Sequence, residues 1–264
     1  MAIKIGFINQ KGGVAKTTSV IEVATCLGKE GKRVLVVDCD QQRHLSIYSD
    51  ADLEAPSLFE ILNGEIYVKD AIQHKKNYDI ITASGKLSKA DKTFTDADDV
   101  YLMVDVCDEI DEDYDFILFD NSPARNILLS MVYNAVSYIV IPTESDKGSL
   151  IGLMDVHNDL IPIRDGKRPQ TKAIIIEILI TKAETNTISY RGAKEAIDNV
   201  YVPEIESVQH NKIQVHTISK ATNASNCKIQ NKSMQEYDPY NNVSVDYRKF
   251  TKSILERVAK GELK

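Results

Sequence analysis

Residues 3–18 of the chain read Ile3-Lys4-Ile5-Gly6-Phe7-Ile8-Asn9-Gln10-Lys11-Gly12-Gly13-Val14-Ala15-Lys16-Thr17-Thr18, and this stretch decides the fold that we expect. Its first residues form an apolar run typical of a buried strand, and an apolar pattern of helical period follows it as far as Gly31. A strand that passes through a glycine-bearing turn into a helix directs backbone N–H groups, and the positive end of the helix dipole, at one point. We therefore predict that residues 9–18 bind polyphosphate.

The residues of this loop have separate expected roles. Gly12 and Gly13 let the backbone wrap closely around the phosphates, Lys16 reaches the terminal phosphates, and the Thr17 hydroxyl is placed to ligate Mg²⁺. The loop departs from the pattern Gly-x-x-x-x-Gly-Lys-Ser/Thr, because Gln10 and Ala15 stand at the two glycine positions. The nucleotide-binding residues that we predict are Lys11, Gly12, Gly13, Val14, Ala15, Lys16, Thr17 and Thr18.

Short apolar runs alternate with helix-period segments along the whole chain, which predicts an α/β fold. Runs such as Val34-Leu35-Val36-Val37 are apolar at consecutive positions, a pattern typical of parallel strands buried on both faces. We expect one doubly wound domain, residues 1–264, with a mostly parallel central sheet. The predicted strands are Ile3–Asn9, Arg33–Asp38, Tyr78–Ala83, Asp115–Asp120, Ser137–Pro142, Lys172–Thr181 and Ile213–Ile218.

Helices are predicted between these strands, and polar surface loops at residues 84–97, 164–171 and 219–233. The helical segments after the first one are Ser57–Gly64, Asp98–Ile110, Asn126–Ala135, Gly148–Leu160, Ser189–Val200 and Val245–Ala259.

The composition excludes several classes of protein. The 32 Lys and Arg against 39 Asp and Glu give a net charge of -7, which excludes a uniformly basic nucleic-acid coat but permits a local basic patch. The four cysteines lie far apart without a Cys-x-x-Cys pair, which argues against a zinc site, an iron–sulfur cluster and a disulfide scaffold. No apolar run approaches the roughly 20 residues of a membrane span, and the N-terminus lacks the apolar region of a signal peptide, so we expect a cytoplasmic protein.

Carboxylates follow two more of the predicted strands. Asp38 and Asp40 come at the end of the second strand, and Asp120 follows the apolar run 116–119. The carboxyl ends of parallel strands meet at one edge of the sheet, so these side chains are expected beside the phosphate loop. We predict that Thr17, Asp38 and Asp120 serve Mg²⁺, the two carboxylates through its water shell, and that Asp40 orients or deprotonates an attacking water.

The run from Lys11 to Thr18 resembles the deviant Walker A loop of the ParA/Soj and MinD family of P-loop ATPases. Other motifs of that family follow in the same order. The segment Val37-Asp38-Cys39-Asp40-Gln41-Gln42 is similar to its Asp-x-Asp-Pro-Gln motif, with Gln41 in place of proline, and Tyr114-Asp115-Phe116-Ile117-Leu118-Phe119-Asp120 resembles its Walker B motif. The stretch from Ile218-Ser219-Lys220 to Glu236-Tyr237-Asp238-Pro239 is similar to its C-terminal part. The resemblance implies an ATPase that takes ATP, ADP and Mg²⁺.

The resemblance also implies a role for the second lysine, Lys11. In the geometry of this family that lysine points away from its own nucleotide and enters the site of a partner subunit, so Lys11 is expected to be catalytic together with Lys16 and Asp40. ATP binding would then drive a sandwich homodimer. The backbone near 181–182 and 219–220 is expected to contact adenine.

Within the family we expect a DNA partition ATPase. Such a protein binds DNA without sequence preference as an ATP-bound dimer, associates with the nucleoid, and is stimulated by a ParB-like centromere-binding protein. The charge pattern favours this branch, because residues 91–115 hold eleven acidic residues and one basic residue, whereas residues 207–235 hold four lysines and no acidic residue. Relatives often use two arginines for DNA at the positions of Asn186 and Asn223. The DNA-binding candidates here are Arg191, Lys220, Lys228 and Lys232.

Two other functions stay open. In a MinD-like positioning ATPase the segment 245–259 would act as a basic amphipathic membrane helix, but the same stretch matches the last packed helix of the fold, and we expect no stable membrane association. Ala15 and Gln41 depart from the family pattern, which leaves open a regulator that binds nucleotide without hydrolysing it.

Overall fold

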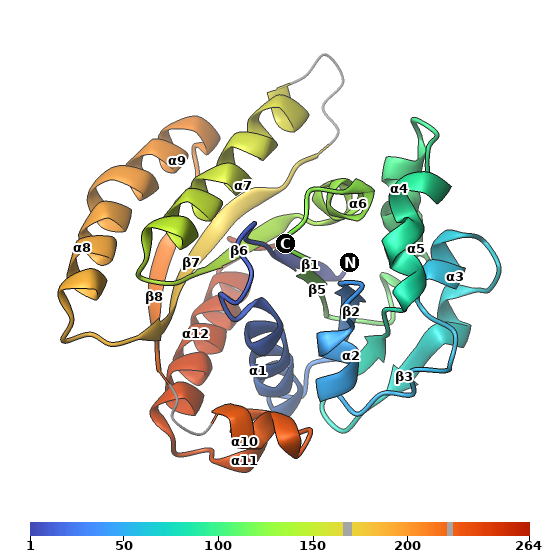
Figure 1. Ribbon diagram of the computed structural model, residues 1–264, viewed down its shortest axis with the longest axis horizontal. Helices are drawn as coiled ribbons and strands as arrows, with labels where there is room; N and C mark the ends of the chain where they lie inside the picture. Colours follow the sequence, from blue (N-terminus) through green and yellow to red (C-terminus); the bar gives the residue numbers. More distant parts are fainter. Residues whose placement is uncertain (166–170, 221–223) are drawn as a thin grey trace.

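The computed structural model describes residues 1–165, 171–220 and 224–264, and an eight-stranded sheet forms its centre (Figure 1). The strand order is β3-β4-β2-β5-β1-β6-β7-β8, and the pairings are parallel except that of β3 with β4. The strands are β1 Ile3–Phe7, β2 Val34–Cys39, β3 Ile72–His74, β4 Asp79–Ile81, β5 Phe116–Asn121, β6 Tyr138–Thr143, β7 Ile174–Ala183 and β8 Gln214–Ser219. The mostly parallel α/β fold is confirmed. The sequence pattern misses β3, because its three residues are not fully buried and form no apolar run.

Helices pack on both faces of the sheet. They are α1 Lys16–Lys29, α2 His44–Tyr48, α3 Leu58–Leu62, α4 Ala90–Thr93, α5 Leu102–Ile110, α6 Ile127–Ala135, α7 Lys147–Asp165, α8 Ile188–Ala196, α9 Val202–Gln209, α10 Ala224–Ile229, α11 Met234–Tyr237 and α12 Asn242–Ala259. Two of the predicted loops are wrong in part, because 84–97 contains a 3₁₀ turn and α4, and 219–233 contains α10. In the third predicted loop, residues 164–165 belong to the end of α7 and residues 166–170 lie outside the described residues, as do residues 221–223 of the loop 219–233.

The consecutive apolar residues of the strands are explained by the two packed faces. In β2, Val34 and Val36 join the apolar cluster under α1 and α12, whereas Leu35 and Val37 join the cluster that includes α3, α5 and α6. Successive strand residues point to opposite faces, so a strand covered on both sides needs apolar residues at every position. The four cysteines are buried in this core, and none of them forms a disulfide.

The last helix, α12, packs against α1 and β8. Its residues Tyr247, Phe250 and Ile254 are at most 1% exposed, which confirms that the apolar face predicted in this segment belongs to the core. Among the described residues, no helix combines the length and the apolar character that crossing a membrane requires.

The topology places the phosphate loop where ligands bind in open α/β sheets. β1 lies between β5 and β6. After β1 the chain passes through α1 to β2 on one side of the sheet, and β6, β7 and β8 extend the sheet on the other side. The crevice at the carboxyl end of such a strand is open to a ligand. Asp38 and Asp120 are register partners on β2 and β5, so both carboxylates lie at this edge.

Candidate nucleotide-binding site

Lys16 lies at the centre of the loop that joins β1 to α1. Its Nζ donates hydrogen bonds to the main-chain carbonyls of Asn9 and Lys11, both at 3.0 Å, and the residue is 7% exposed. Burial lowers the pKa of Lys16, while the charges of Asp120 and Asp40 act in the opposite direction. An anion that entered the loop would meet a cation with little competing water, and charge interactions are strong in such surroundings.

The loop has room for phosphate groups. A Cβ atom built on Gly12 or on Gly13 meets no other atom within 4 Å. Gly13 has a φ of +83°, a conformation that glycine adopts without a steric cost. The open space beside the Lys16 ammonium therefore fits the polyphosphate that the sequence predicts.

Ala15 is strained where the loop enters α1. Its φ of 66° and ψ of 30° lie in the left-handed region, which costs an L-residue with a side chain roughly 1–2 kcal/mol. Glycine at this position would remove that cost.

We expect Ala15→Gly to stabilise the protein by about 0.5–1 kcal/mol, because the relief of strain exceeds the extra freedom that glycine has in the unfolded chain. Urea denaturation measures the free energy of unfolding. As a control, Ala196 has the helical φ of -62°, so Ala196→Gly should instead destabilise the protein by about 0.5–1 kcal/mol. Equal destabilisation by both substitutions would show that Ala15 carries no relievable strain.

Asp120 and Asp38 are fully buried beside Thr17. Asp120 Oδ2 accepts a hydrogen bond from Thr17 Oγ1 at 2.6 Å, whereas its Oδ1 is buried without a partner among the residues that the structure describes. Burial, reinforced by the charge of Asp38, raises the pKa of Asp120 to about 8, and burial raises that of Asp38 to about 6. A buried, unpartnered carboxylate oxygen beside a hydroxyl is a fitting donor set for Mg²⁺, which prefers oxygen ligands and keeps several waters.

Asp38 is held by residues of the segment that follows β2. Its carboxylate accepts hydrogen bonds from Ser46 N at 2.9 Å, Ser46 Oγ at 2.7 Å and Asp40 N at 3.1 Å. Asp40 is half-buried and accepts a hydrogen bond from Gln42 N at 2.9 Å. Lys16, Asp38, Asp40 and Asp120 thus lie close enough to affect one another's charge, as the sequence predicts, whereas the role of Ser46 is not visible in the sequence.

Lys11 is turned away from Lys16 and rests on the first turn of α7. Its Nζ forms an ion pair with Asp146 at 2.6 Å and donates to Ser149 Oγ at 3.1 Å. Asp146 also accepts hydrogen bonds from the backbone N–H groups of Gly148 and Ser149, and although burial acts to raise its pKa, the hydrogen bonds from Lys11 and Ser149 lower it to about 2. No sequence motif marks Asp146, although its place just after β6 puts it at the same edge of the sheet.

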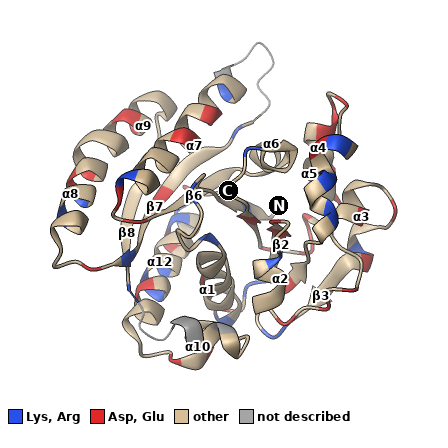
Figure 2. Cartoon of the chain, viewed as in Figure 1, with Lys and Arg blue, Asp and Glu red and all other residues tan. Residues whose placement is uncertain are grey.

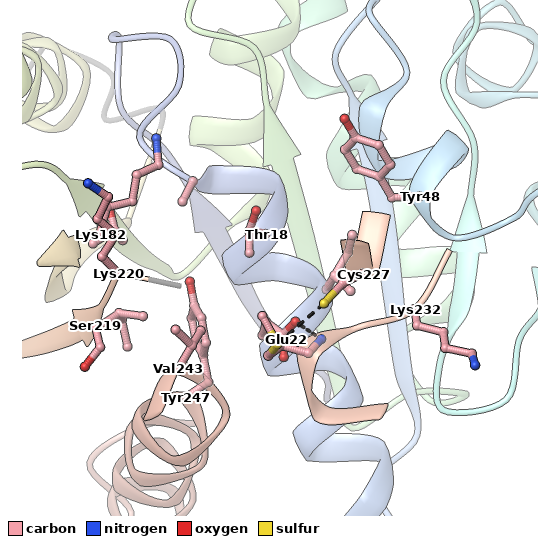
Figure 3. Close-up of a pocket in the computed structure, with 15 residues that line it drawn as sticks. Thr18, Glu22, Tyr48, Lys182, Ser219, Lys220, Cys227, Lys232, Val243 and Tyr247 are labelled. Atoms are coloured by element: carbon pink, nitrogen blue, oxygen red, sulfur yellow. Dashed lines mark hydrogen bonds between the residues drawn. The ribbon is translucent and has the colours of Figure 1, made fainter. Parts of the chain in front are cut away.

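A cavity of about 200 Å³ lies beside the start of α1. Figure 3 shows Thr18 and Glu22 of α1 on one side of it and Val243 and Tyr247 of α12 on the other. The predicted adenine-contacting segments also line it, with the residues Thr181, Lys182, Ser219 and Lys220. Its apolar walls suit a flat aromatic base, because ligand pockets combine apolar surface with a few polar groups.

The carboxyl end of β7 is joined to the phosphate loop by hydrogen bonds. Lys182 Nζ donates to the Gly13 carbonyl at 2.6 Å and forms an ion pair with Glu144 at 2.7 Å, and Thr181 Oγ1 donates to the Val14 carbonyl at 3.1 Å. These contacts place one wall of the cavity directly against the loop.

Comparisons with known proteins agree with this geometry. The sequence model of a family described as an AAA domain matches residues 2–173, which is more than half of the chain. The chain is also 30% identical over 198 residues to the chromosome-partitioning ATPase Soj of Treponema pallidum, covering 74% of this chain and 76% of that one. The chain belongs to the ParA/MinD family of P-loop ATPases.

Solved structures share the fold of this ParA/MinD-family protein. Cobyrinic acid a,c-diamide synthase of Mycobacterium smegmatis, with bound ADP and magnesium, matches with a TM-score of 0.81 and 20% identity over 99% of this chain and 97% of that one. A protein described as a plasmid partition protein of Borrelia burgdorferi, bound to AMPPNP, matches with a TM-score of 0.78 and 22% identity over 99% and 100%. An uncharacterized Mycobacterium tuberculosis protein is 30% identical over 193 residues, 71% of this chain, and the chain covers 60% of its length.

Glu22 of this family member is a buried acid in the wall of the cavity. Its carboxylate accepts hydrogen bonds from Met234 N at 2.5 Å and Gln235 N at 3.2 Å. Burial nevertheless raises the pKa of Glu22 to about 7, above its usual value of 4.5. Between these two pH values the folded protein keeps a proton that the unfolded chain loses.

We therefore expect the free energy of unfolding to fall by roughly 3 kcal/mol from this group as the pH rises from 4.5 to 7. Glu22→Gln cannot ionise, so urea denaturation at pH 5 and pH 8 should show a smaller decline for this variant than for the unaltered protein. Glu195 is exposed, and Glu195→Gln serves as a control that should leave the decline unchanged. If the free energy of unfolding declined equally with pH in Glu22→Gln and in the unaltered protein, a raised pKa of Glu22 would be contradicted.

Figure 2 shows Lys and Arg (blue) and Asp and Glu (red) on the same helices, among them α7, α8 and α12. Lys220 is ion-paired with Glu184, and Lys212, in the same lysine-rich stretch, is ion-paired with Glu206 at 2.8 Å. Arg191 on α8 donates to the carbonyl of Asn186 at 3.0 Å and remains exposed. Lys232 is exposed and lines the cavity together with Lys220, whereas the side chain of Lys228 lies outside the described residues.

Proposed function

We propose that this protein is a DNA partition ATPase, in which binding of ATP and Mg²⁺ drives formation of a homodimer that holds DNA without sequence preference. Hydrolysis, stimulated by a centromere-binding partner of the ParB kind, resets the cycle. The observation that carries the proposal is the different placement of two lysines in one phosphate loop. Lys16 is buried at the centre of the loop, and Lys11 points outward onto α7.

Each charged group of the site has a role in this proposal. Lys16 would hold the β- and γ-phosphates, Thr17 would ligate the magnesium ion, and Asp38 and Asp120 would act through its water shell. The magnesium ion supplies neutralisation of the phosphate charge. Asp40 orients the attacking water or accepts its proton.

Lys11 acts across the dimer. Its side chain is 36% exposed, and its partner Asp146 keeps three other hydrogen-bond donors when the lysine leaves. When Lys11 moves toward the nucleotide of a second subunit, the carboxylate of Asp146 is therefore not left without hydrogen-bond donors. A cation supplied in this way stabilises the charge that develops on the transferred phosphoryl group.

Cosedimentation tests the proposal. The protein with ATP and Mg²⁺ is mixed with linear duplex DNA in one series and with vesicles of phosphatidylglycerol and phosphatidylethanolamine in another. We expect ATP-dependent retention on DNA that is lost at high salt, because phosphate contacts release counterions. Pelleting with the vesicles and not with DNA would reject partition in favour of a MinD-like function, and the absence of phosphate release with DNA and the partner would favour a regulator that does not hydrolyse ATP.

A further inference from the structure

The carboxylate of Asp159 joins two segments that surround the phosphate site. Asp159 lies on α7 and accepts hydrogen bonds from Arg125 Nε at 3.2 Å and Arg125 Nη2 at 3.0 Å. The same carboxylate accepts a hydrogen bond from Gln10 Nε2. Gln10 directly precedes Lys11 in the phosphate loop, and Arg125 lies in the connection between β5, which carries Asp120, and α6.

Packing does not hold Arg125 in place by itself. Its side chain is 56% exposed and lines a groove of about 370 Å³ between α6 and α7. The paired contact to Asp159 fixes both the position and the plane of the guanidinium, because two parallel hydrogen bonds define its orientation.

We propose that Asp159 is a positioning residue for ATP hydrolysis, which holds the connection 122–126 against the phosphate loop through Arg125 and Gln10. This inference rests on the proposed function, since it concerns the hydrolytic step. The segment 122–126 follows β5 directly, so it leaves the sheet beside the carboxyl end that carries Asp120. Asp159 contributes little to stability, because exposed ion pairs add little, and its effect lies in geometry.

Asp159→Asn tests the proposal. We expect its kcat for ATP to fall about tenfold while KM changes less than twofold, because small misplacements near reacting groups slow the reaction without preventing binding. Hydrogen exchange of the nucleotide-free protein should be faster in residues 122–126. Asp159→Glu keeps a carboxylate and should restore most of the activity.

Asp155→Asn is the matched control. Asp155 lies one turn earlier on α7 and contacts Arg125 at 3.4 Å, but within the described part of the chain it forms no hydrogen bond with Gln10. This variant should retain kcat and show a smaller change in exchange. Unchanged kcat and exchange in Asp159→Asn, or equal effects of both substitutions, would overturn the proposal. If the unaltered protein fails to hydrolyse ATP, the proposed function fails, and faster exchange in Asp159→Asn alone still supports positioning by Asp159.

Discussion

Lys11→Ala is expected to leave ATP bound by a monomer and to lower the rate of hydrolysis by about a thousandfold, the smaller end of the effects known for a cation supplied in trans. Lys16 stays at the centre of the loop in this variant, so each subunit keeps its own phosphate contacts. The missing lysine removes the contribution that one subunit makes to the other. Analytical ultracentrifugation with ATP measures dimerisation, and phosphate release measures turnover.

The surroundings of Lys11 make this substitution interpretable. Asp146 keeps its hydrogen bonds from Ser149 Oγ at 2.7 Å and from the N–H of Gly148 at 2.9 Å, so the variant should fold. Lys252 is 77% exposed and far from the phosphate loop in the sequence, and Lys252→Ala removes one surface charge as a control. Normal dimerisation and turnover in Lys11→Ala would disprove the sandwich arrangement.

Asp40→Ala is expected to bind ATP and remain as a dimer on DNA while hydrolysis falls by about a hundredfold or more, as for the loss of a general base. Asp40 is not needed for the Lys16 and Thr17 contacts, so nucleotide binding should survive. Retention on a DNA-coated surface, followed after removal of free protein, measures the lifetime of the complex.

Two further variants separate chemistry from structure at this position. Asp40→Asn can still accept the hydrogen bond from Gln42 N, which Asp40→Ala loses, and it should trap the dimer equally well. Asp70 is an exposed carboxylate, and Asp70→Ala should leave hydrolysis and release unchanged. Rapid release of Asp40→Ala from DNA in the presence of ATP would show that Asp40 does not control hydrolysis.

The sequence predicts most of the fold because its strands are buried on both faces. Runs such as Val34 to Val37 mark the parallel sheet without reference to the rest of the chain. The short β3 and the small helices α4 and α10 escape prediction, since each has too few residues to show a period.

The phosphate loop and the carboxylates after β2 and β5 were predictable for a related reason. Their chemistry depends on a strand, a turn and a helix that are neighbours in the sequence, and on the rule that parallel strands end at one edge. The structure brings Lys16, Thr17, Asp38, Asp40 and Asp120 together as this rule requires.

The ion pairs of the lysines could not be predicted by counting charged residues along the chain. The lysine-rich stretch 207–235 suggests a basic surface, but Lys220 and Lys212 meet glutamates that lie outside it. A surface formed by folding has a different charge balance from a segment, because its neighbours come from other elements.

The sequence by itself determined the α/β fold, the position of the phosphate loop and the presence of two lysines, Lys11 and Lys16, in that loop. Only the tertiary structure decided that Lys11 rests on Asp146 and that Gln10 and Arg125 share Asp159. Lys11 and Gln10 lie more than 130 residues from these partners on or beside α7. Such contacts depend on β6 being the neighbour of β1 in the sheet, which brings α7 to the loop, and no local pattern of residues encodes that order.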